Sequence, residues 1–226
     1  MIEVVCVKWG TKFTPQYVNN LYNGIKHNTN INFRFHCYTD STTDLQDPII
    51  THKLPEGLEG WWNKVYLFSD QLTHDIGADM VYMDLDTVIT GNIDHILRYK
   101  PKHFAGLENW YRPGQLNSSV MLWQHGNMFK AWNDFAEDPQ RAINSTTDGD
   151  QEFINRYMTE ADYLQTQFPK QLFSYKQSCS KGLPNDTRLV CYHGTPSIEQ
   201  SYSETVTNYD GVWQPQTWVK QYWRTA

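Results

Sequence analysis

The segment MVYMDLDTVI, residues 80–89, determines the fold expected of this chain. Its first four residues are apolar and predict a buried strand, and Asp84 and Asp86 follow directly at the strand's end. In extended backbone, alternate side chains share a face, so the two carboxylates point together while Leu85 points away. Hard oxygen donors placed side by side suit Mg²⁺ or Mn²⁺. The segment therefore predicts a metal site at the carboxyl end of a strand.

Strands and helices alternate upstream of this segment. Residues 2–8 are almost continuously apolar and predict a buried parallel strand. Thr14 then provides an N-cap before Pro15, and an amphipathic helix follows. Apolar side chains alternate along a second strand that starts near Phe33 and ends at Thr39 and Asp40. A strand, a helix and a strand of these lengths predict a right-handed parallel unit.

The same periodicities predict the later elements. We expect a short strand at 49–53, one helix over 62–76, strands at 80–83, 119–123 and 189–192, and helices over 128–135 and 151–158. The polar stretches 138–149 and 174–186 are expected to be loops. The pattern predicts a single α/β domain over residues 1–226, with its sites at the carboxyl ends of the strands.

Composition narrows the class of function. A formal net charge of −6 argues against a nucleic-acid partner, which needs a clustered excess of Lys and Arg. The sequence contains no apolar run of the ~20 residues that a transmembrane segment requires. The first residues do not resemble a signal peptide, so a cytoplasmic location is expected. Aromatic residues make up 15% of the chain, and their amphipathic rings suit sugar faces but suit cores and interfaces equally well, so this feature only leans toward carbohydrate ligands.

A phosphatase is the main rival interpretation of the two aspartates. Residues 84–89 also match the DxDx[TV][LV] string of the haloacid-dehalogenase phosphatases, in which the first aspartate is a nucleophile. That motif normally follows the first strand of the core, whereas at least two predicted strands precede it here. The later acidic motif of that family is also unmatched, since Glu152 stands at the wrong spacing after Asp150. The context favours a metal site instead.

Residues 82–93 resemble the metal-binding segment of glycosyltransferase family 8 and of related bacterial and phage GT-A enzymes. Further segments resemble the same group in the same order: Val7–Gly10 with Tyr17, Trp61–Tyr66, Leu116–Leu122, Asp150–Glu152 and Cys191–Gly194. The resemblance covers roughly residues 2 to 196. It implies one GT-A, Rossmann-like domain with a mostly parallel central sheet flanked by helices. The implied activity is metal-dependent transfer of a hexose from a nucleotide-diphosphate sugar to an unidentified saccharide or other hydroxyl acceptor.

The resemblance also implies roles for individual residues. Asp84, Asp86 and His193 would be ligands of Mn²⁺ or Mg²⁺. Asp150 and Gln151 would lie on the β-face of the donor sugar and carry the catalytic role. The remaining implied contacts with the donor or its nucleotide are those of Lys8, Trp9, Gly10, Thr39, Asp40, Lys64, Asn117, Ser118, Ser119 and Gly194.

Several alternatives stay open at this point. Asp150 also suits the N-cap position of the helix expected after it. The first strand ends in Lys8-Trp9-Gly10 rather than in the acidic segment usual in the family, which leaves uridine versus guanosine undecided. By the resemblance a UDP-sugar is favoured, and a GDP-sugar is the alternative. No lysine follows His193-Gly194, so stabilisation of the leaving group falls on the metal or on Lys64. Retention of configuration is implied by analogy. The alternative functions are a DxD phosphatase or nucleotidyltransferase, and a non-catalytic nucleotide-sugar-binding domain.

Overall fold

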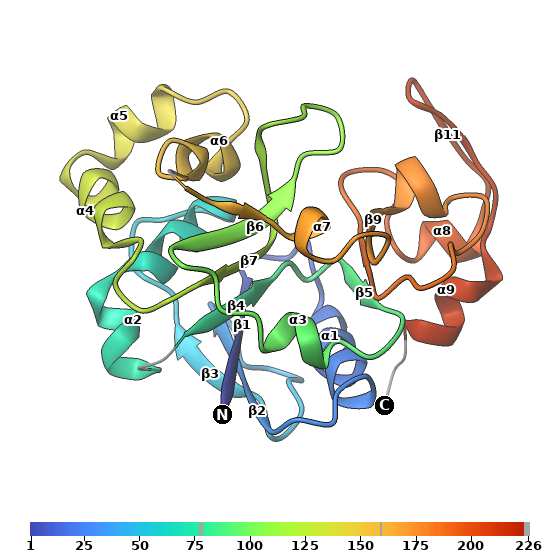
Figure 1. Cartoon of the computed structure of the whole chain (residues 1–226), viewed down its shortest axis with the longest axis horizontal. Helices are drawn as coiled ribbons and strands as arrows, with labels where there is room; N and C mark the ends of the chain where they lie inside the picture. Colours follow the sequence, from blue (N-terminus) through green and yellow to red (C-terminus); the bar gives the residue numbers. More distant parts are fainter. Residues whose placement is uncertain (77–78, 159, 224–226) are drawn as a thin grey trace.

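A seven-stranded mixed sheet forms the centre of the computed structural model, which describes residues 1–76, 79–158 and 160–223 (Figure 1). Its first four strands run parallel; β7 is antiparallel to both of its neighbours, and β8 is parallel to β6. The mostly parallel α/β sheet confirms the predicted fold class. In spatial order the strands are β3 (Ile50–Lys53), β2 (Phe33–Thr39), β1 (Ile2–Lys8), β4 (Met80–Met83), β7 (Leu116–Trp123), β6 (Phe104–Glu108) and β8 (Asp162–Tyr163).

Helices cover both faces of this sheet because side chains alternate along its buried strands. Val4 and Cys6 of β1 belong to one apolar core, and Val5 between them belongs to the other. The first core includes α1 (Pro15–His27) and α3 (Asp94–Leu97). The second contains residues of the 3₁₀ helix η1 (Gly60–Phe68), α2 (Asp70–Asp75), α4 (Phe129–Glu137), α5 (Pro139–Asn144) and α6 (Asp150–Asn155).

A smaller sheet lies beside the central one and brings the end of the chain to the two aspartates. It has the order β5 (Thr87–Ile89), β10 (Leu189–Cys191) and β9 (Leu172–Ser174), with β10 antiparallel to β5. Because Cys191 pairs with Thr87, the residues after β10 lie next to Asp86, and Tyr192 N donates to the Asp86 carbonyl oxygen at 3.0 Å. The other elements are α7 (Leu164–Gln167), a π-helix η2 (Tyr175–Cys179), α8 (Gln200–Ser203), the hairpin β11 (Val206–Asn208) and β12 (Gly211–Trp213), and α9 (Thr217–Tyr222).

The strands at 2–8 and 80–83 and the start of the first helix at Pro15 agree with the sequence predictions. The prediction of a single helix over 62–76 is wrong. Ser69 is extended at ψ 156° and separates η1 from α2, and its Oγ accepts a hydrogen bond from Leu72 N at 3.4 Å. The strand predicted at 119–123 begins earlier, at Leu116.

The predicted loop 138–149 contains α5, which Asp138 begins by accepting a hydrogen bond from Arg141 N at 2.9 Å. Pro139 in the first turn suits this helix start. The predicted loop 174–186 contains the π-helix η2. The N-cap position of α6 is held by Gly149 at φ 70°, so Asp150 is the first residue of the helix and its side chain is directed to other partners.

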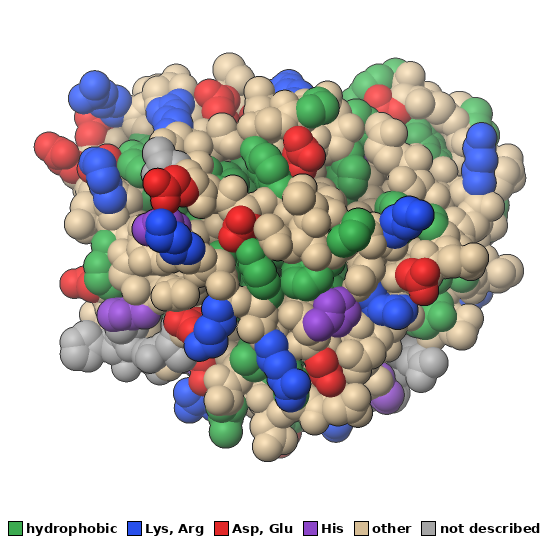
Figure 2. Space-filling view, viewed as in Figure 1, with side chains coloured by type: hydrophobic (Ala, Val, Ile, Leu, Met, Phe, Trp, Pro, Cys, Tyr) green, Lys and Arg blue, Asp and Glu red, His purple; other side chains and the backbone are tan. Residues whose placement is uncertain are grey.

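Two general surface features complete the fold. Basic and acidic side chains are interspersed over the face drawn in Figure 2. Among the residues that the structure describes, no helix is both long and apolar enough to cross a membrane.

Phe135 joins three helices of the second core and provides a test of the packing. Its ring is fully buried, stacks on Trp62 at 5.6 Å between ring centroids and meets Phe153 edge-on at 5.5 Å. We expect Phe135→Ala to cost about 3–5 kcal/mol of unfolding free energy. At ~2–4 °C per kcal/mol, its melting temperature should fall by about 6–20 °C in a calorimetric scan. Tyr209→Ala, at a side chain that is 97% exposed, should leave it unchanged; similar values for the two variants would contradict this packing.

Candidate active site

A cavity of about 540 Å³ lies where β1, β4 and β7 meet the start of α6 and the residues after β10. It gathers most of the side chains singled out in the sequence, although they come from six separate stretches of chain. Those predicted residues that line it are Trp9, Lys64, Asp84, Asp86, Asn117, Ser118, Ser119, Asp150, Gln151, His193 and Gly194.

The other predicted nucleotide-binding residues lie beside this cavity. Thr39 and Asp40 line an adjoining pocket of about 240 Å³, and Trp9 lines both. Asp40 accepts a hydrogen bond from Gly10 N at 2.7 Å. Lys8 is buried; its Nζ donates to the Gly10 carbonyl oxygen at 3.2 Å and lies 3.8 Å from Asp40 Oδ1. These contacts fix the loop after β1.

A buried lysine ties the end of β4 to the start of α6. Lys64 Nζ lies 2.8 Å from Asp84 Oδ1 and 3.4 Å from Asp150 Oδ2, and donates to Ser118 Oγ at 3.3 Å. Ser118 Oγ in turn donates to Asp150 Oδ2 at 2.7 Å. Burial alone would lower the pKa of Lys64, but the charges of Asp150 and Asp84 outweigh it and raise that pKa. The lysine therefore stays charged.

The two aspartates of the strand end occupy different environments. Asp84 Oδ1 accepts a hydrogen bond from the Tyr82 hydroxyl at 2.6 Å and pairs with Lys64 Nζ, so the charge of Asp84 has a counter-ion. Burial and the charge of Asp84 raise the pKa of Asp86 to about 7. Asp86 is therefore a carboxylate that lacks a sufficient counter-charge.

His193 stands at the side of the cavity formed by the residues after β10. Its Nε2 lies 2.7 Å from Ser174 Oγ, and its ring stacks on Trp110 at 5.8 Å between centroids, with Tyr111 edge-on at 5.5 Å. Burial, followed by the charge of Lys176, lowers the pKa of His193 to about 4. The imidazole is neutral near pH 7, as a metal ligand must be.

The side chains present partly fit a divalent cation. Within the ranges 1–76, 79–158 and 160–223, no group of three His, Cys, Asp or Glu side chains is assembled to hold a metal ion. The chemistry of the pair Asp84 and Asp86 nevertheless suits Mn²⁺ or Mg²⁺, and the raised pKa of Asp86 reflects an unmet demand for positive charge. His193 lines the same cavity but is engaged by Ser174. The aspartate pair fits the cation, and the imidazole would have to leave the serine to join it.

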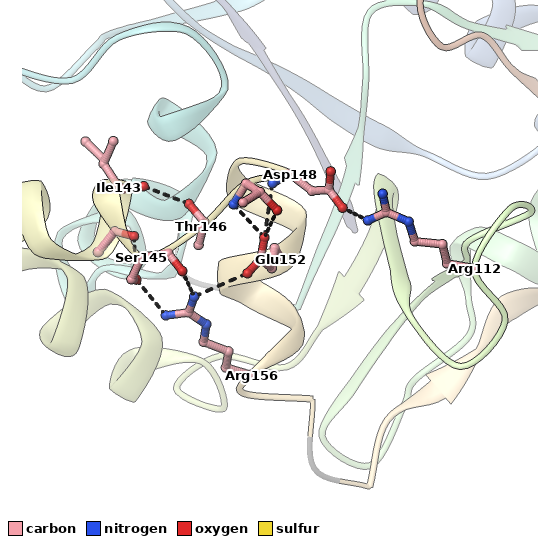
Figure 3. Close-up of polar contacts among 9 residues, drawn as sticks. Arg112, Ile143, Ser145, Thr146, Asp148, Glu152 and Arg156 are labelled. Atoms are coloured by element: carbon pink, nitrogen blue, oxygen red, sulfur yellow. Dashed lines mark hydrogen bonds and ion pairs between the residues drawn. The ribbon is translucent and has the colours of Figure 1, made fainter.

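The loop between α5 and α6 is held in place by its own hydrogen bonds (Figure 3). Glu152 Oε2 accepts from Thr147 N at 2.7 Å and from Asp148 N at 3.0 Å. Arg156 binds the carbonyl oxygen of Ser145 at 2.6 Å. Asp148 then forms an ion pair with Arg112 of the β6–β7 loop, so the two loops meet at the edge of the cavity (Figure 3).

Some residues that line the cavity were not assigned from the sequence. They include Lys12, whose charge acts on Asp86, and Trp61, whose side chain is 56% exposed. A Cβ on Gly149 would lie 2.4 Å from Trp61 Nε1, so only glycine fits between that ring and α6. Lys12 lies in an irregular loop, and neither periodicity nor a motif in the sequence indicates that its side chain faces the cavity. Trp61 belongs to one of the segments that resemble the GT-A enzymes, but the sequence does not show whether Trp61 or Trp62 faces the cavity.

Two solved glycosyltransferases have similar structures. The galactosyltransferase LgtC, solved in complex with donor and acceptor sugar analogs, matches with a TM-score of 0.62 and 11% identity over 87% of this chain and 89% of that one. The glycosyltransferase GlyE of Streptococcus pneumoniae TIGR4 matches with a TM-score of 0.68 and 12% identity over 93% of this chain and 59% of that one. No protein-family model and no curated protein sequence matches the chain. The chain therefore has the GT-A fold.

The charge deficit around Asp86 leads to a stability prediction. Since its pKa is raised, keeping this carboxylate ionised at pH 8 costs folding free energy. We expect Asp86→Asn to stabilise the metal-free protein by about 1–2 kcal/mol, or roughly 2–8 °C in melting temperature. The measurement is differential scanning calorimetry at pH 8 with a chelator.

Asp94→Asn is the matched control with the opposite sign. The pKa of Asp94 is lowered by its hydrogen bonds, first that from Thr29, so neutralising it should destabilise the fold. If Asp86→Asn also lowers the melting temperature, the charge of Asp86 does not destabilise the folded protein and the prediction is wrong.

Proposed function

We propose that this chain is a metal-dependent glycosyltransferase that moves a hexose from a nucleotide-diphosphate sugar to a hydroxyl acceptor. One observation carries the proposal: a single cavity is lined by residues from every segment of the sequence that resembles the GT-A enzymes. A second observation supports it, since LgtC, which shares the fold, was solved with donor and acceptor sugar analogs.

In this proposal, Asp84 and Asp86 hold Mn²⁺ or Mg²⁺, and His193 joins them as a neutral imidazole. When bound, the metal supplies positive charge for the diphosphate and for the nucleoside diphosphate as it departs. The residues that line the cavity include four aspartates and two lysines. Asp148 is paired with Arg112, so three aspartates face two lysines and the lining is anionic without a metal ion. This balance favours a site that takes a divalent cation together with a diphosphate.

Asp150 and Gln151 act at the donor sugar. Asp150 is buried on the cavity wall, and Lys64 and Ser118 fix its carboxylate at 3.4 and 2.7 Å. A carboxylate held in place at this wall would stabilise positive charge that develops on the sugar ring. The neighbouring Asn117, Ser119 and Gln151 would then bind the sugar hydroxyls. This arrangement supports transfer with retention, in line with the family resemblance.

The nucleotide is proposed to lie at the end of the cavity nearest β1 and β2. Trp9 is 40% exposed and lines both the cavity and the adjoining pocket, so its ring can stack on a base. Thr39 and Asp40 offer polar groups in the adjoining pocket, while Lys8 and Gly10 shape the loop. A UDP-sugar is the favoured donor, with a GDP-sugar as the alternative.

The phosphatase alternative is disfavoured by the comparisons, because both similar solved structures are glycosyltransferases. The carboxylate of Asp84 is also held in place, since its Oδ1 accepts from the Tyr82 hydroxyl and pairs with the Lys64 ammonium, at 2.6 and 2.8 Å.

Nucleotide binding is the first test of the proposed donor. A thermal-shift panel of UDP, GDP, CDP and ADP, each with and without Mn²⁺, should show one nucleotide that stabilises the protein only with the metal. At 100 times its dissociation constant, a ligand stabilises the folded state by about 2.7 kcal/mol, which corresponds to a shift of roughly 5–11 °C. Absence of a shift with every nucleotide would contradict the proposal.

Asp150→Asn tests the catalytic assignment separately from binding. Because the carboxylate would act mainly on the transition state, we expect turnover of the donor sugar to fall by about 10²–10³-fold. The dissociation constant of the nucleoside diphosphate should stay within about threefold, since the variant leaves the metal ligands in place. Glu137→Gln, at an exposed carboxylate, is the control. Equal losses of binding and turnover in Asp150→Asn would indicate a structural role instead.

A further inference from the structure

A third lysine lies close to the cavity that Lys12 and Lys64 line, although it does not line the cavity itself. Lys176 is on the π-helix η2, and its side chain is only 13% exposed. Its Nζ lies 4.0 Å from the position that a Cβ would occupy on Gly194, which does line the cavity. The ammonium group therefore lies close to a residue of the cavity wall, and Gly194 has no side chain that could stand between the two.

The cavity is short of positive charge where a diphosphate would lie. Asp84, Asp86 and Asp150 line it, against Lys12 and Lys64. The fourth aspartate of the lining, Asp148, is paired with Arg112. Lys64 is already shared between two of these carboxylates. Asp84 and Asp86 together would already balance the charge of a divalent metal ion. A diphosphate with two negative charges would therefore need a further cation, and a lysine on a flexible four-carbon stem can supply one.

The counter-ion of Lys176 comes from the C-terminal hairpin. Asp210 lies at the turn between β11 and β12, and its Oδ2 is 3.1 Å from Lys176 Nζ. Asn208 fixes the turn, since its Oδ1 accepts from Asp210 N at 2.8 Å. The Trp213 ring lies 5.9 Å from the ammonium group. The pair is partly exposed on the aspartate side, at 36%, so water weakens it and another anion can exchange with Asp210.

We propose that Lys176 is a second cation for the diphosphate of the donor, and that Asp210 competes with the diphosphate for it. This inference rests on the proposed function, because it assumes a nucleoside diphosphate in the cavity. In this arrangement the hairpin β11–β12 weakens donor binding, because the diphosphate must displace Asp210 before it can contact Lys176. The chain has no lysine in the residues directly after His193-Gly194, and Lys176 reaches the same glycine from another element.

The two members of the ion pair should give opposite results. With Mn²⁺ present, titration calorimetry with UDP and GDP should show Lys176→Met raising the dissociation constant of the nucleoside diphosphate about tenfold. Asp210→Asn should lower it by about three- to tenfold, because the lysine no longer has a competing anion. The double variant should behave like Lys176→Met.

Three controls separate this role from a structural one. UMP and GMP lack the second phosphate, so their dissociation constants should change by less than about twofold in every variant. Lys181→Met removes an exposed lysine from the following loop and should leave binding unchanged. Lys176→Arg keeps the charge and should retain most of the affinity.

The outcomes distinguish this inference from the proposed function. If the unmodified protein binds neither UDP nor GDP with Mn²⁺, the proposed function itself fails. If it binds one of them and Asp210→Asn leaves affinity unchanged or weakens it, the competition is overturned. If Lys176→Met changes diphosphate and monophosphate binding equally, Lys176 is a structural residue and the assignment is wrong.

Discussion

The site depends on one buried cation held between two carboxylates. Lys64 brings η1, the end of β4 and the start of α6 together, at 2.8 Å from Asp84 and 3.4 Å from Asp150. Each of these charges would cost several kcal/mol to bury alone, so their positions are fixed only as a set. Without the ammonium group, the carboxylates of Asp84 and Asp150 would lie close together without their shared counter-ion. The ionic contact between α6 and the end of β4 would also be lost. The geometry that we propose for the donor site depends on this contact.

The smaller sheet adds the second half of the site. Because β10 pairs with β5 directly after Asp86, residues more than a hundred positions later in the chain are placed beside the aspartate pair. His193 and Gly194 therefore line the same cavity as Asp150 and Ser118, and Lys176 lies close to Gly194. The cavity is anionic, which supports our proposal that a divalent cation and a diphosphate bind there together rather than singly.

The sequence predicted the parts of the fold that depend on strong local periodicity. Residues 80–83 are continuously apolar and residues 2–8 almost so, and Pro15 marks a helix start, so these boundaries were correct. The helix predicted over 62–76 failed because apolar spacing does not reveal the extended Ser69, and α5 was missed although Asp138-Pro139 carries a start signal. Contacts between distant residues, such as His193 with Ser174 or Lys176 with Asp210, cannot be read from spacing because they depend on how the smaller sheet and the hairpin pack.

The central claim is that Asp84 and Asp86 hold a divalent cation that receives the donor's diphosphate. The most direct measurement is a crystal structure of the protein with Mn²⁺ and the nucleoside diphosphate that it binds, with data collected to locate manganese by its anomalous scattering. We predict one manganese peak in contact with both carboxylates and with oxygens of both phosphates. A diphosphate in the cavity with no manganese at these aspartates, or manganese bound elsewhere, would contradict the claim.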